Sequence, residues 1–332
     1  MGKSLIMKLE LNEKKIAVFC PSFFGYDIDI KNALEGLGAE VHLSDERVFE
    51  SVFGRALVRL GFNSLVRPHV NAFYTSNLIN RVKNLDYVLL INPETIPVEL
   101  IKKSKEINPD VVIITYMWDS FKNKPFSKKY IDASDVFYSF DPIDAKENNL
   151  KFLPLFYTND YENIKGNDIK YDFSFVGTAH SERFKSVLNI SKGDYKRLLF
   201  FYCPSKLVFA YKKYLKNELA GLELKDVSFS PMSRQNVINL IEESRVIIDI
   251  SHPSQVGLTM RTIEMLGAQK KLITTNEQVL NYDFYHANNI LVVDEKISQE
   301  IIRSFVETPY TPVNLRTREQ YSINSWIEKL FL

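Results

Sequence analysis

Short apolar runs rich in Val, Ile and aromatic residues alternate with longer amphipathic segments along most of this chain. In the first half, these runs predict six strands, at residues 16–19, 40–43, 87–91, 111–116, 136–140 and 152–156. Apolar positions three and four apart predict helices between them, at residues 28–37, 75–85 and 98–107. The alternation is typical of a parallel sheet that is covered by helices on both faces.

The same alternation begins again in the second half. The predicted strands are residues 173–176, 198–202, 227–229, 246–250, 271–274 and 290–293. The predicted helices between and after them are residues 181–190, 206–221, 233–245, 258–269 and 298–308. Between the two halves lies a polar stretch, TNDYENIKGNDIK, with one Gly and no clear period, which we interpret as a linker.

The pattern predicts an α/β protein with two Rossmann-like αβα domains that face a cleft. At 332 residues the chain exceeds the size at which a single core stops growing. Right-handed crossovers between parallel strands make the Rossmann arrangement the simplest topology. The predicted boundaries are an N-terminal domain at 1–157, a linker at 158–170, a C-terminal domain at 171–315 and a terminal helix at 316–332.

The pattern leaves two placements open for the terminal segment and predicts little regular structure in one internal segment. The terminal segment 318–332 is amphipathic, and it either crosses back to the first domain or packs locally on the second. The segment 48–70 is the least regular, and its apolar positions predict one or two short helices near the cleft.

Composition and charge exclude several classes of protein. Apolar residues make up 45% and aromatic residues 13% of the chain, which is typical of a folded globular protein. The 42 basic and 41 acidic residues nearly balance, so we expect no nucleic-acid partner and at most peripheral membrane contact, although a local patch is compatible with either. Cys20 and Cys203 have no metal-ligand spacing and are predicted to be small core residues, as in a reducing compartment. With no signal-like or membrane-spanning run, the sequence predicts a cytoplasmic protein.

The segment 251–276 carries the strongest candidate chemistry. A predicted strand leads into a loop with Gly257, and a helix begins near Leu258 or Thr259. The unpaired N–H groups and positive end of such a helix bind anions, so a diphosphate suits this position. Arg261 and Glu264 share one face of that helix, where Arg would pair with a phosphate and Glu would accept from ribose hydroxyls. A surface ion pair between them is the alternative.

This segment resembles the C-terminal motif of the group 1 glycosyltransferases of the GT-B fold, in particular the CgeB-like branch. The matching residues are Arg261 and Glu264, followed by Gly267-Ala268 and the strand 271–274. The resemblance implies that Glu264 holds the ribose of a nucleotide-sugar donor, while the preceding residues Gly257, Leu258 and Thr259 hold its diphosphate. Many members carry an acidic residue seven positions before that Glu, where this chain has Gly257 and, nearby, Gln255.

A second segment, DFSFVGTAHSER, matches the same family. A predicted strand ends in Gly177-Thr178, and group 1 enzymes place a Gly-containing turn here beside the donor phosphates. Gly177 permits close backbone approach, Ser181 is a candidate N-cap, and His180 and Arg183 would reach a phosphate. His252, in the other loop, is either a packed histidine or a further phosphate donor.

Candidate acceptor residues follow strands of the first half. An inverting transfer needs a base that takes the acceptor's proton, and Asp27 and Asp119 are the candidates for it, whereas a retaining transfer can proceed without one. Phe24, Tyr26 and Trp118 are candidates for stacking on sugar rings. Each has a structural alternative. Asp27 or Asp29 would cap the next helix, Asp119 would cap a helix or turn, and Phe24 and Trp118 would be core residues.

The motifs favour one function over two others. No metal cluster is visible, Asp27-Ile28-Asp29 precedes a helix and is treated as coincidence, and neither a dinucleotide fingerprint nor a P-loop occurs. We expect a hexosyltransferase-type glycosyltransferase that needs no metal or other cofactor. Its partners would be a nucleotide-sugar donor and a glycan or lipid-linked acceptor of surface polysaccharide or lipopolysaccharide synthesis, at the inner face of the cytoplasmic membrane. A nucleotide-sugar epimerase and a non-catalytic two-lobed binding protein are the alternatives.

Overall fold

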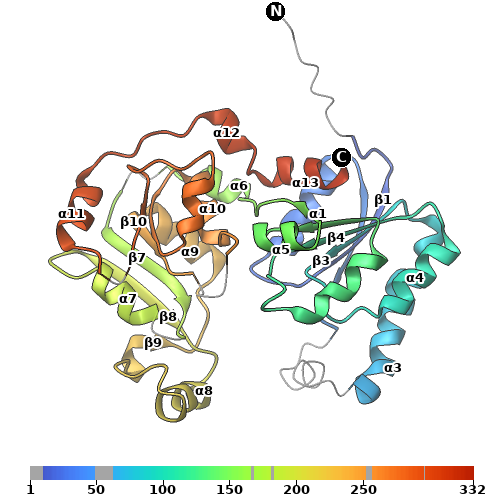
Figure 1. Ribbon diagram of the computed structural model, residues 1–332, viewed down its shortest axis with the longest axis horizontal. Coiled ribbons are helices and arrows are strands. Elements are labelled where there is room, and N and C mark those ends of the chain that lie inside the picture. The colour runs from blue at the N-terminus through green and yellow to red at the C-terminus, as the bar shows by residue number, and fades with distance from the viewer. Residues whose placement is uncertain (1–9, 49–62, 166–167, 181–182, 252–255, 295) are drawn as a thin grey trace, which may run out of the picture. The chain divides into compact units, whose positions relative to one another are not determined.

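The computed structural model describes residues 10–48, 63–165, 168–180, 183–251, 256–294 and 296–332. The chain divides into two compact units (Figure 1). The first contains the described residues of Met1–Leu155 and Ser254–Gly257, together with Ile323–Leu332. The second contains those of Phe156–Pro253 and Leu258–Ser322. Residues 49–62 of the segment 48–70 lie outside the described residues, as do Ser181, His252 and Gln255. The end of that segment, residues 63–70, is helical as predicted and belongs to α3 (Asn63–Tyr74).

A six-stranded parallel sheet forms the centre of the first unit, with strand order β2-β1-β3-β4-β5-β6. The order reverses between β1 and β3, as in doubly wound folds. Its strands are β1 (Lys15–Cys20), β2 (Glu40–Asp45), β3 (Tyr87–Ile91), β4 (Val112–Met117), β5 (Val136–Ser139) and β6 (Lys151–Phe152).

Helices flank this sheet and complete its core. They are α1 (Tyr26–Gly36), α3 (Asn63–Tyr74), α4 (Val98–Ile107), α5 (Pro142–Glu147) and α13 (Ile323–Phe331), with a 3₁₀ segment at Pro125–Ala133. One face of the sheet buries Ala17, Phe19, Val88 and Leu90 against α3 and α4 residues such as Tyr74. The apolar runs of the sequence therefore become the buried centre of the unit.

The second unit also has a six-stranded parallel sheet, ordered β12-β11-β10-β7-β8-β9. In chain order this is the Rossmann arrangement, and the reversal lies between β7 and β10. The strands are β7 (Tyr171–Thr178), β8 (Arg197–Tyr202), β9 (Val227–Ser228), β10 (Ser244–Asp249), β11 (Lys271–Thr274) and β12 (Ile290–Val292). The helices are α6 (Asn159–Glu162), α7 (Arg183–Ile190), α8 (Lys206–Ala210), α9 (Arg234–Glu242), α10 (Met260–Ala268), α11 (Gln299–Glu307) and α12 (Leu315–Glu319).

The predicted alternation of strands and helices is confirmed, and both cysteines are free and buried. The predicted strand 152–156 is shorter than expected, because β6 ends at Phe152 and Pro154, which has no N–H, follows shortly after. The predicted helix 75–85 is a π-helical turn at Thr75–Ile79 and a 3₁₀ turn at Val82–Asn84. The side-chain amide of Asn77 donates to the carbonyl of Phe73, the group that regular α-helical bonding would use.

The terminal helix α13 belongs to the first unit, so the first of the two predicted placements is correct. The Trp326 ring meets the Tyr116 ring of β4 edge to face, with centroids 4.8 Å apart. The Tyr138 hydroxyl of β5 donates to the carbonyl of Lys329 at 2.8 Å. Figure 1 shows this helix beside α1 of the first unit.

Candidate functional site

Several of the residues predicted to bind a donor lie at or after the carboxyl ends of β7 and β10, whereas Gly257 belongs to the first unit. Gly177 and Thr178 are the last residues of β7, and Asp249 is the last residue of β10. These neighbouring strands flank the point where the strand order of the second unit reverses. In open parallel sheets ligands bind at this point, because the connections leave it in opposite directions.

Asp249 fixes the start of α10. Thr259 is the N-cap, and its hydroxyl accepts from the Thr262 N–H at 3.2 Å. The hydroxyls of Thr259 and Thr262 both donate to Asp249 Oδ2. Burial raises the pKa of the Asp249 carboxyl above its usual value, while these hydrogen bonds act in the opposite direction. The positive end of the nine-residue helix α10 is thereby held at the carboxyl edge of β10.

Arg183, the first residue of α7, lies over the end of β7. A Cβ added at Gly177 would stand 3.3 Å from Arg183 Nη1 and 2.6 Å from the Phe175 ring, so Gly is needed here for close packing. Burial lowers the pKa of Arg183, and the charge of Asp249 opposes that shift. Its buried Nε has no hydrogen-bond partner among the described residues. A half-buried cation whose inner N–H donor lacks a partner among the described residues is a group that an anion would satisfy.

Arg261 and Glu264 form the predicted ion pair, with Arg261 Nη1 3.1 Å from Glu264 Oε2. The alternative of a surface pair is wrong, because the Glu264 side chain is only 2% exposed. The Tyr161 hydroxyl of α6 donates to the Glu264 carboxylate, and burial together with that carboxylate raises the pKa of Tyr161. Glu264 is therefore a buried and oriented acceptor rather than a solvated side chain.

The segment predicted as a linker holds α6 and is fastened to α9 and α10. Arg234 of α9 donates to Thr158 Oγ1 at 2.9 Å and pairs with Asp160 at 2.9 Å. A Cβ added at Gly267 would stand 2.5 Å from the Tyr157 ring, so α10 packs closely against the start of this segment. The small residue after the Arg-x-x-Glu motif thus has a packing reason.

The other predicted donor residues differ in their surroundings. The Gly257 N–H donates to Asp141 Oδ2 at 3.1 Å, and a Cβ there would meet the Phe140 ring at 2.6 Å. Leu258 is buried, Thr178 is exposed and His180 is half-buried. The second oxygen of Asp141 caps α5 by accepting from Ile143 and Asp144 N–H groups.

In the first unit, Asp27 lies in the first turn of α1 but does not cap it. The N-cap is Gly25, whose φ of 79° is accessible to glycine without strain, and no side chain caps the helix. The alternative of an Asp27 or Asp29 N-cap is therefore wrong. The Asp27 side chain is buried, and its Oδ1 has no hydrogen-bond partner among the residues that the structure describes.

Asp119, two residues after β4, accepts from the side-chain amide of Asn92 at 3.2 Å. Trp118 beside it is half-buried. Phe24 is 45% exposed, so the alternative of a core residue is wrong for it, whereas Tyr26 is buried.

The sequence analysis did not identify Glu46, which directly follows β2 at the carboxyl edge of the first sheet. Its Oε1 accepts from the N–H groups of Glu94 at 2.7 Å and Thr95 at 2.5 Å, so it ties the loop after β3 to the end of β2. Its Oε2 is buried without a hydrogen-bond partner in the described part of the chain, and burial raises the pKa of Glu46 to about 7. The signal in the sequence was the acidic pair Asp45-Glu46, which follows the predicted strand 40–43 after one residue. Asp249, at the end of β10, was a similar signal.

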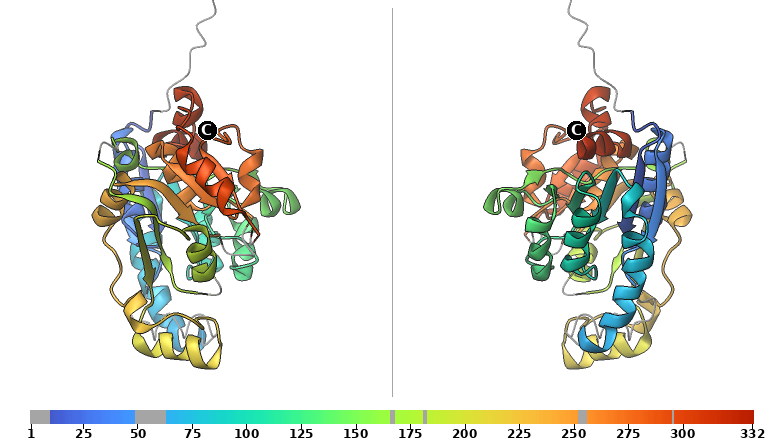
Figure 2. Two further views of the ribbon diagram at one scale, coloured as in Figure 1. Left: turned by 90° about the vertical axis from the view of Figure 1, so that its left-hand side faces the viewer. Right: turned by 90° about the vertical axis from the view of Figure 1, so that its right-hand side faces the viewer.

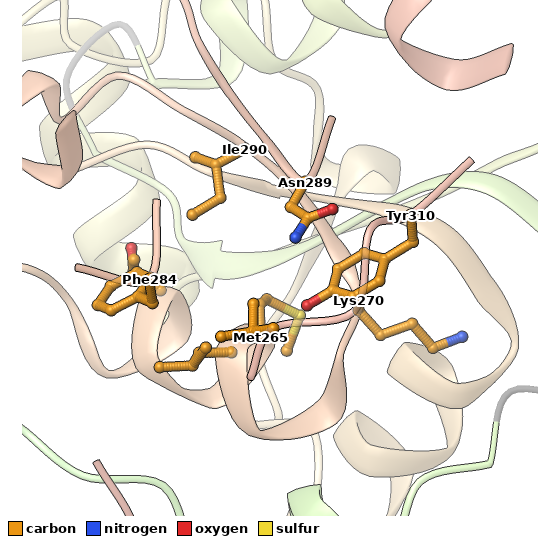
Figure 3. Close-up of a pocket in the computed structure, with 9 residues that line it drawn as sticks. Met265, Lys270, Phe284, Asn289, Ile290 and Tyr310 are labelled. Carbon is orange, nitrogen blue, oxygen red and sulfur yellow. The ribbon is translucent and has the colours of Figure 1, made fainter. Parts of the chain in front are cut away.

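Figure 3 shows a cavity on another side of α10, lined by Met265, Phe284, Ile290 and Tyr310 among others. Its volume of about 10 Å³ is the room that about one water molecule needs, so it is too small for a nucleotide. Within the described ranges, no group of three or more His, Cys, Asp or Glu side chains is placed to hold a metal ion. Nor is any described helix long and apolar enough to cross a membrane.

No protein-family model matches the sequence, and no curated protein is significantly similar to it. Solved structures are similar over nearly the whole chain. The apo form of the lipopolysaccharide outer core galactosyltransferase WaaB has a TM-score of 0.53 and 13% identity, covering 96% of this chain and 99% of that one.

Two further structures agree. Anabaena HepE in complex with UDP and glucose has a TM-score of 0.59 and 12% identity, covering 96% of this chain and 99% of that one. Sucrose-phosphate synthase from Thermosynechococcus elongatus has a TM-score of 0.60 and 9% identity, covering 96% and 98%. At such identities the similarity shows the fold: the chain has the two Rossmann-like domains of the GT-B fold.

Proposed function

We propose that the chain is a glycosyltransferase that moves a sugar from a nucleotide-diphosphate sugar to a hydroxyl of a glycan or glycolipid. The observation that carries this proposal is Arg183 at the strand reversal of the second unit, a half-buried guanidinium whose buried Nε has no hydrogen-bond partner among the described residues. The similar structures support the class, since WaaB is a galactosyltransferase and HepE was solved with UDP-glucose. AviGT4, a glycosyltransferase of avilamycin A biosynthesis, also has this fold, with a TM-score of 0.56.

In this proposal the donor diphosphate lies against Arg183, Thr178 and the first turn of α10 after Thr259. The bond between the anomeric carbon and the diphosphate oxygen breaks, and negative charge develops on that oxygen. Arg183 and the positive end of α10 stabilise this charge, so the reaction needs no metal ion. Glu264, oriented by Arg261 and Tyr161, accepts hydrogen bonds from the ribose hydroxyls.

The acceptor residues belong to the first unit. Between the two candidate bases the geometry favours Asp27, because its Oδ1 is without a partner among the described residues, whereas Asp119 already accepts from Asn92. Phe24 and Trp118 supply aromatic faces for a sugar ring. The WaaB similarity supports a surface polysaccharide such as lipopolysaccharide as the product. Our proposal includes that this product is made at the inner face of the cytoplasmic membrane.

Binding of nucleoside diphosphates tests the donor site. UDP, GDP, dTDP and ADP are compared by thermal shift, with and without Mg²⁺ and EDTA, because a ligand of the native state raises its stability. One of them should raise the unfolding temperature regardless of EDTA. Arg183→Ala should weaken that ligand's affinity about tenfold or more, the usual loss for a hydrogen bond to a charged group.

Arg245→Ala is the matched control, because Arg245 lies at the amino end of β10 and pairs with Asp172 at the surface. It should leave affinity unchanged. Equal affinities for wild type and Arg183→Ala would contradict the donor site. Binding without any turnover or donor hydrolysis would instead indicate a binding protein, and release of an isomerised nucleotide-sugar would indicate an epimerase.

A pair of isosteric variants tests the base. With a suitable acceptor, Asp27→Asn should lower kcat by about 10²-fold or more, because general base catalysis contributes about that much. Asp119→Asn should have a much smaller effect. Steady-state rates at saturating donor distinguish the two candidate bases. Equal kcat values for wild type and Asp27→Asn would show that Asp27 is not the general base.

A further inference from the structure

The connection between β8 and β9 presents an apolar face to solvent. It consists of α8 followed by a π-helical turn, η4 (Tyr211–Leu215). Phe209 is buried in the core of the second unit, with Val208 packed beside it. Four apolar residues point the other way, with exposed fractions of 84% for Leu207, 49% for Tyr211, 75% for Tyr214 and 77% for Leu215. Their spacing of four, three and one residues forms a single helical stripe.

This face is also strongly basic. Residues 206–216, KLVFAYKKYLK, contain four lysines and no acidic residue, so they carry a charge of +4 in a chain whose net charge is only +1. Lys206 and Lys216 are exposed at the two ends. Lys212 and Lys213 flank the stripe, and each donates to a backbone carbonyl, Ala179 and Leu222 respectively.

We propose that Leu207, Tyr211, Tyr214 and Leu215, flanked by Lys206 and Lys216, form a docking surface for an anionic lipid bilayer. Leu inserts its apolar side chain at the acyl boundary, Tyr lies at the headgroup level, and Lys pairs with anionic headgroups. These six residues constitute the α8 surface.

The charge and size of the α8 surface favour lipid over a second copy of the chain. Two copies meeting through this face would bring two clusters of +4 together, which like-charge repulsion opposes. Two helical turns also offer far less area than a stable protein interface needs, whereas shallow insertion into a bilayer needs only a few side chains. Figures 1 and 2 show α8 at one end of the second unit.

The α8 surface is connected to the donor edge of the same unit. Lys212 Nζ donates to the Ala179 carbonyl at 3.1 Å, two residues after Gly177. The helix also follows directly from the carboxyl end of β8, which neighbours β7 in the sheet. Docking would therefore hold the strand-reversal edge of the second unit close to the lipid surface.

Vesicle binding of the purified full chain tests this proposal without any sugar nucleotide, so its outcome is independent of the proposed function. Vesicles of equal parts phosphatidylcholine and phosphatidylglycerol are compared with pure phosphatidylcholine by co-sedimentation at about 0.1 M salt. Wild type should bind the anionic vesicles and bind neutral ones much less. Leu207→Ser with Leu215→Ser should weaken binding at least tenfold, and Lys206→Gln with Lys216→Gln about 30-fold, from about 1 kcal/mol per lysine.

The matched controls change exposed residues elsewhere. Phe126→Ser removes an apolar side chain that is 80% exposed in the first unit, and Lys102→Gln with Lys103→Gln removes two exposed charges from α4. Neither should alter binding, and all variants should keep the wild-type unfolding temperature because exposed side chains contribute little to stability. Three results would overturn the proposal: no binding by wild type, equal binding to neutral vesicles, or a concentration-dependent dimer that Leu207→Ser with Leu215→Ser abolishes.

Discussion

At the residue scale, buried carboxylates at strand ends organise both units. Asp249 gathers two threonine hydroxyls and thereby fixes α10, and Glu46 gathers two backbone N–H groups and fixes the loop after β3. Each is removed from water, and burial raises the pKa of each. They differ in that Glu46 keeps one oxygen without a partner in the described structure, so its ionised form is poorly compensated.

This difference predicts a pH-dependent effect of Glu46→Gln. The folded-state pKa of about 7 lies above the usual 4.5, so between these values the unfolded chain releases a proton that the folded chain retains. The contribution of Glu46 to the unfolding free energy of the wild type therefore falls as pH rises through this window and is constant above it. The unfolding free energy of Glu46→Gln minus that of wild type should increase by roughly 3 kcal/mol between pH 4.5 and pH 8, at about 1.4 kcal/mol per pKa unit.

Urea unfolding followed by tryptophan fluorescence measures this difference. Both tryptophans, Trp118 and Trp326, belong to the first unit, which also contains Glu46. A difference between the two proteins that stays constant over the whole pH range would contradict the prediction.

At the element scale, α10 performs several tasks because its faces meet different neighbours. Its first turn is held by Asp249, Glu264 faces Tyr161, and Gly267 packs against Tyr157. Seven of its nine residues are buried, so the helix has little room to shift when one of its side chains is replaced. The Arg-x-x-Glu motif and its small-residue end are therefore parts of one packed unit.

Gly267→Ala should destabilise the protein by about 1–3 kcal/mol, since the new Cβ would stand 2.5 Å from the base of a buried Tyr157 ring. This net cost already includes the gain of about 1 kcal/mol that alanine brings to a helix interior. Hydrogen exchange should increase in α10 and β11.

Gly36→Ala is the control, because it is the last residue of α1 and nothing lies within 4 Å of a Cβ there. It should be neutral or stabilising. If Gly267→Ala and Gly36→Ala changed the unfolding free energy equally, the close approach of α10 to Tyr157 would have no energetic consequence.

At the scale of the whole molecule, the order of segments along the chain does not follow the division into two units. The last ten residues form α13 in the first unit, about two hundred residues after the strands they contact. Trp326, Ile327 and Leu330 are almost fully buried there. The core of the first unit is therefore built from α13 as well as from the strands of the first half of the chain.

Trp326→Ala should lower the unfolding free energy of the first unit by about 3–5 kcal/mol, the usual cost of truncating a buried aromatic residue. Hydrogen exchange should increase in β3, β4 and β5, which are distant in sequence from the substitution. Ile301→Ala, at a site 49% exposed on α11, is the control and should have little effect. Increased exchange confined to α13 would contradict the assignment of this helix to the core of the first unit.

The sequence by itself determined the two sets of six strands and most helices, since a buried parallel strand must be continuously apolar and a covering helix must have an apolar stripe. It also identified Gly177, Arg183, Thr259, Arg261 and Glu264 as candidate residues of one edge. The tertiary structure alone decided which side chains meet. Local pattern does not encode the distances between strand ends, so it left open the partner of Glu264, the role of Asp249 and the burial of Glu46. Nor did it choose between two docking places for α13, because an apolar stripe indicates that a helix is covered but not which surface covers it.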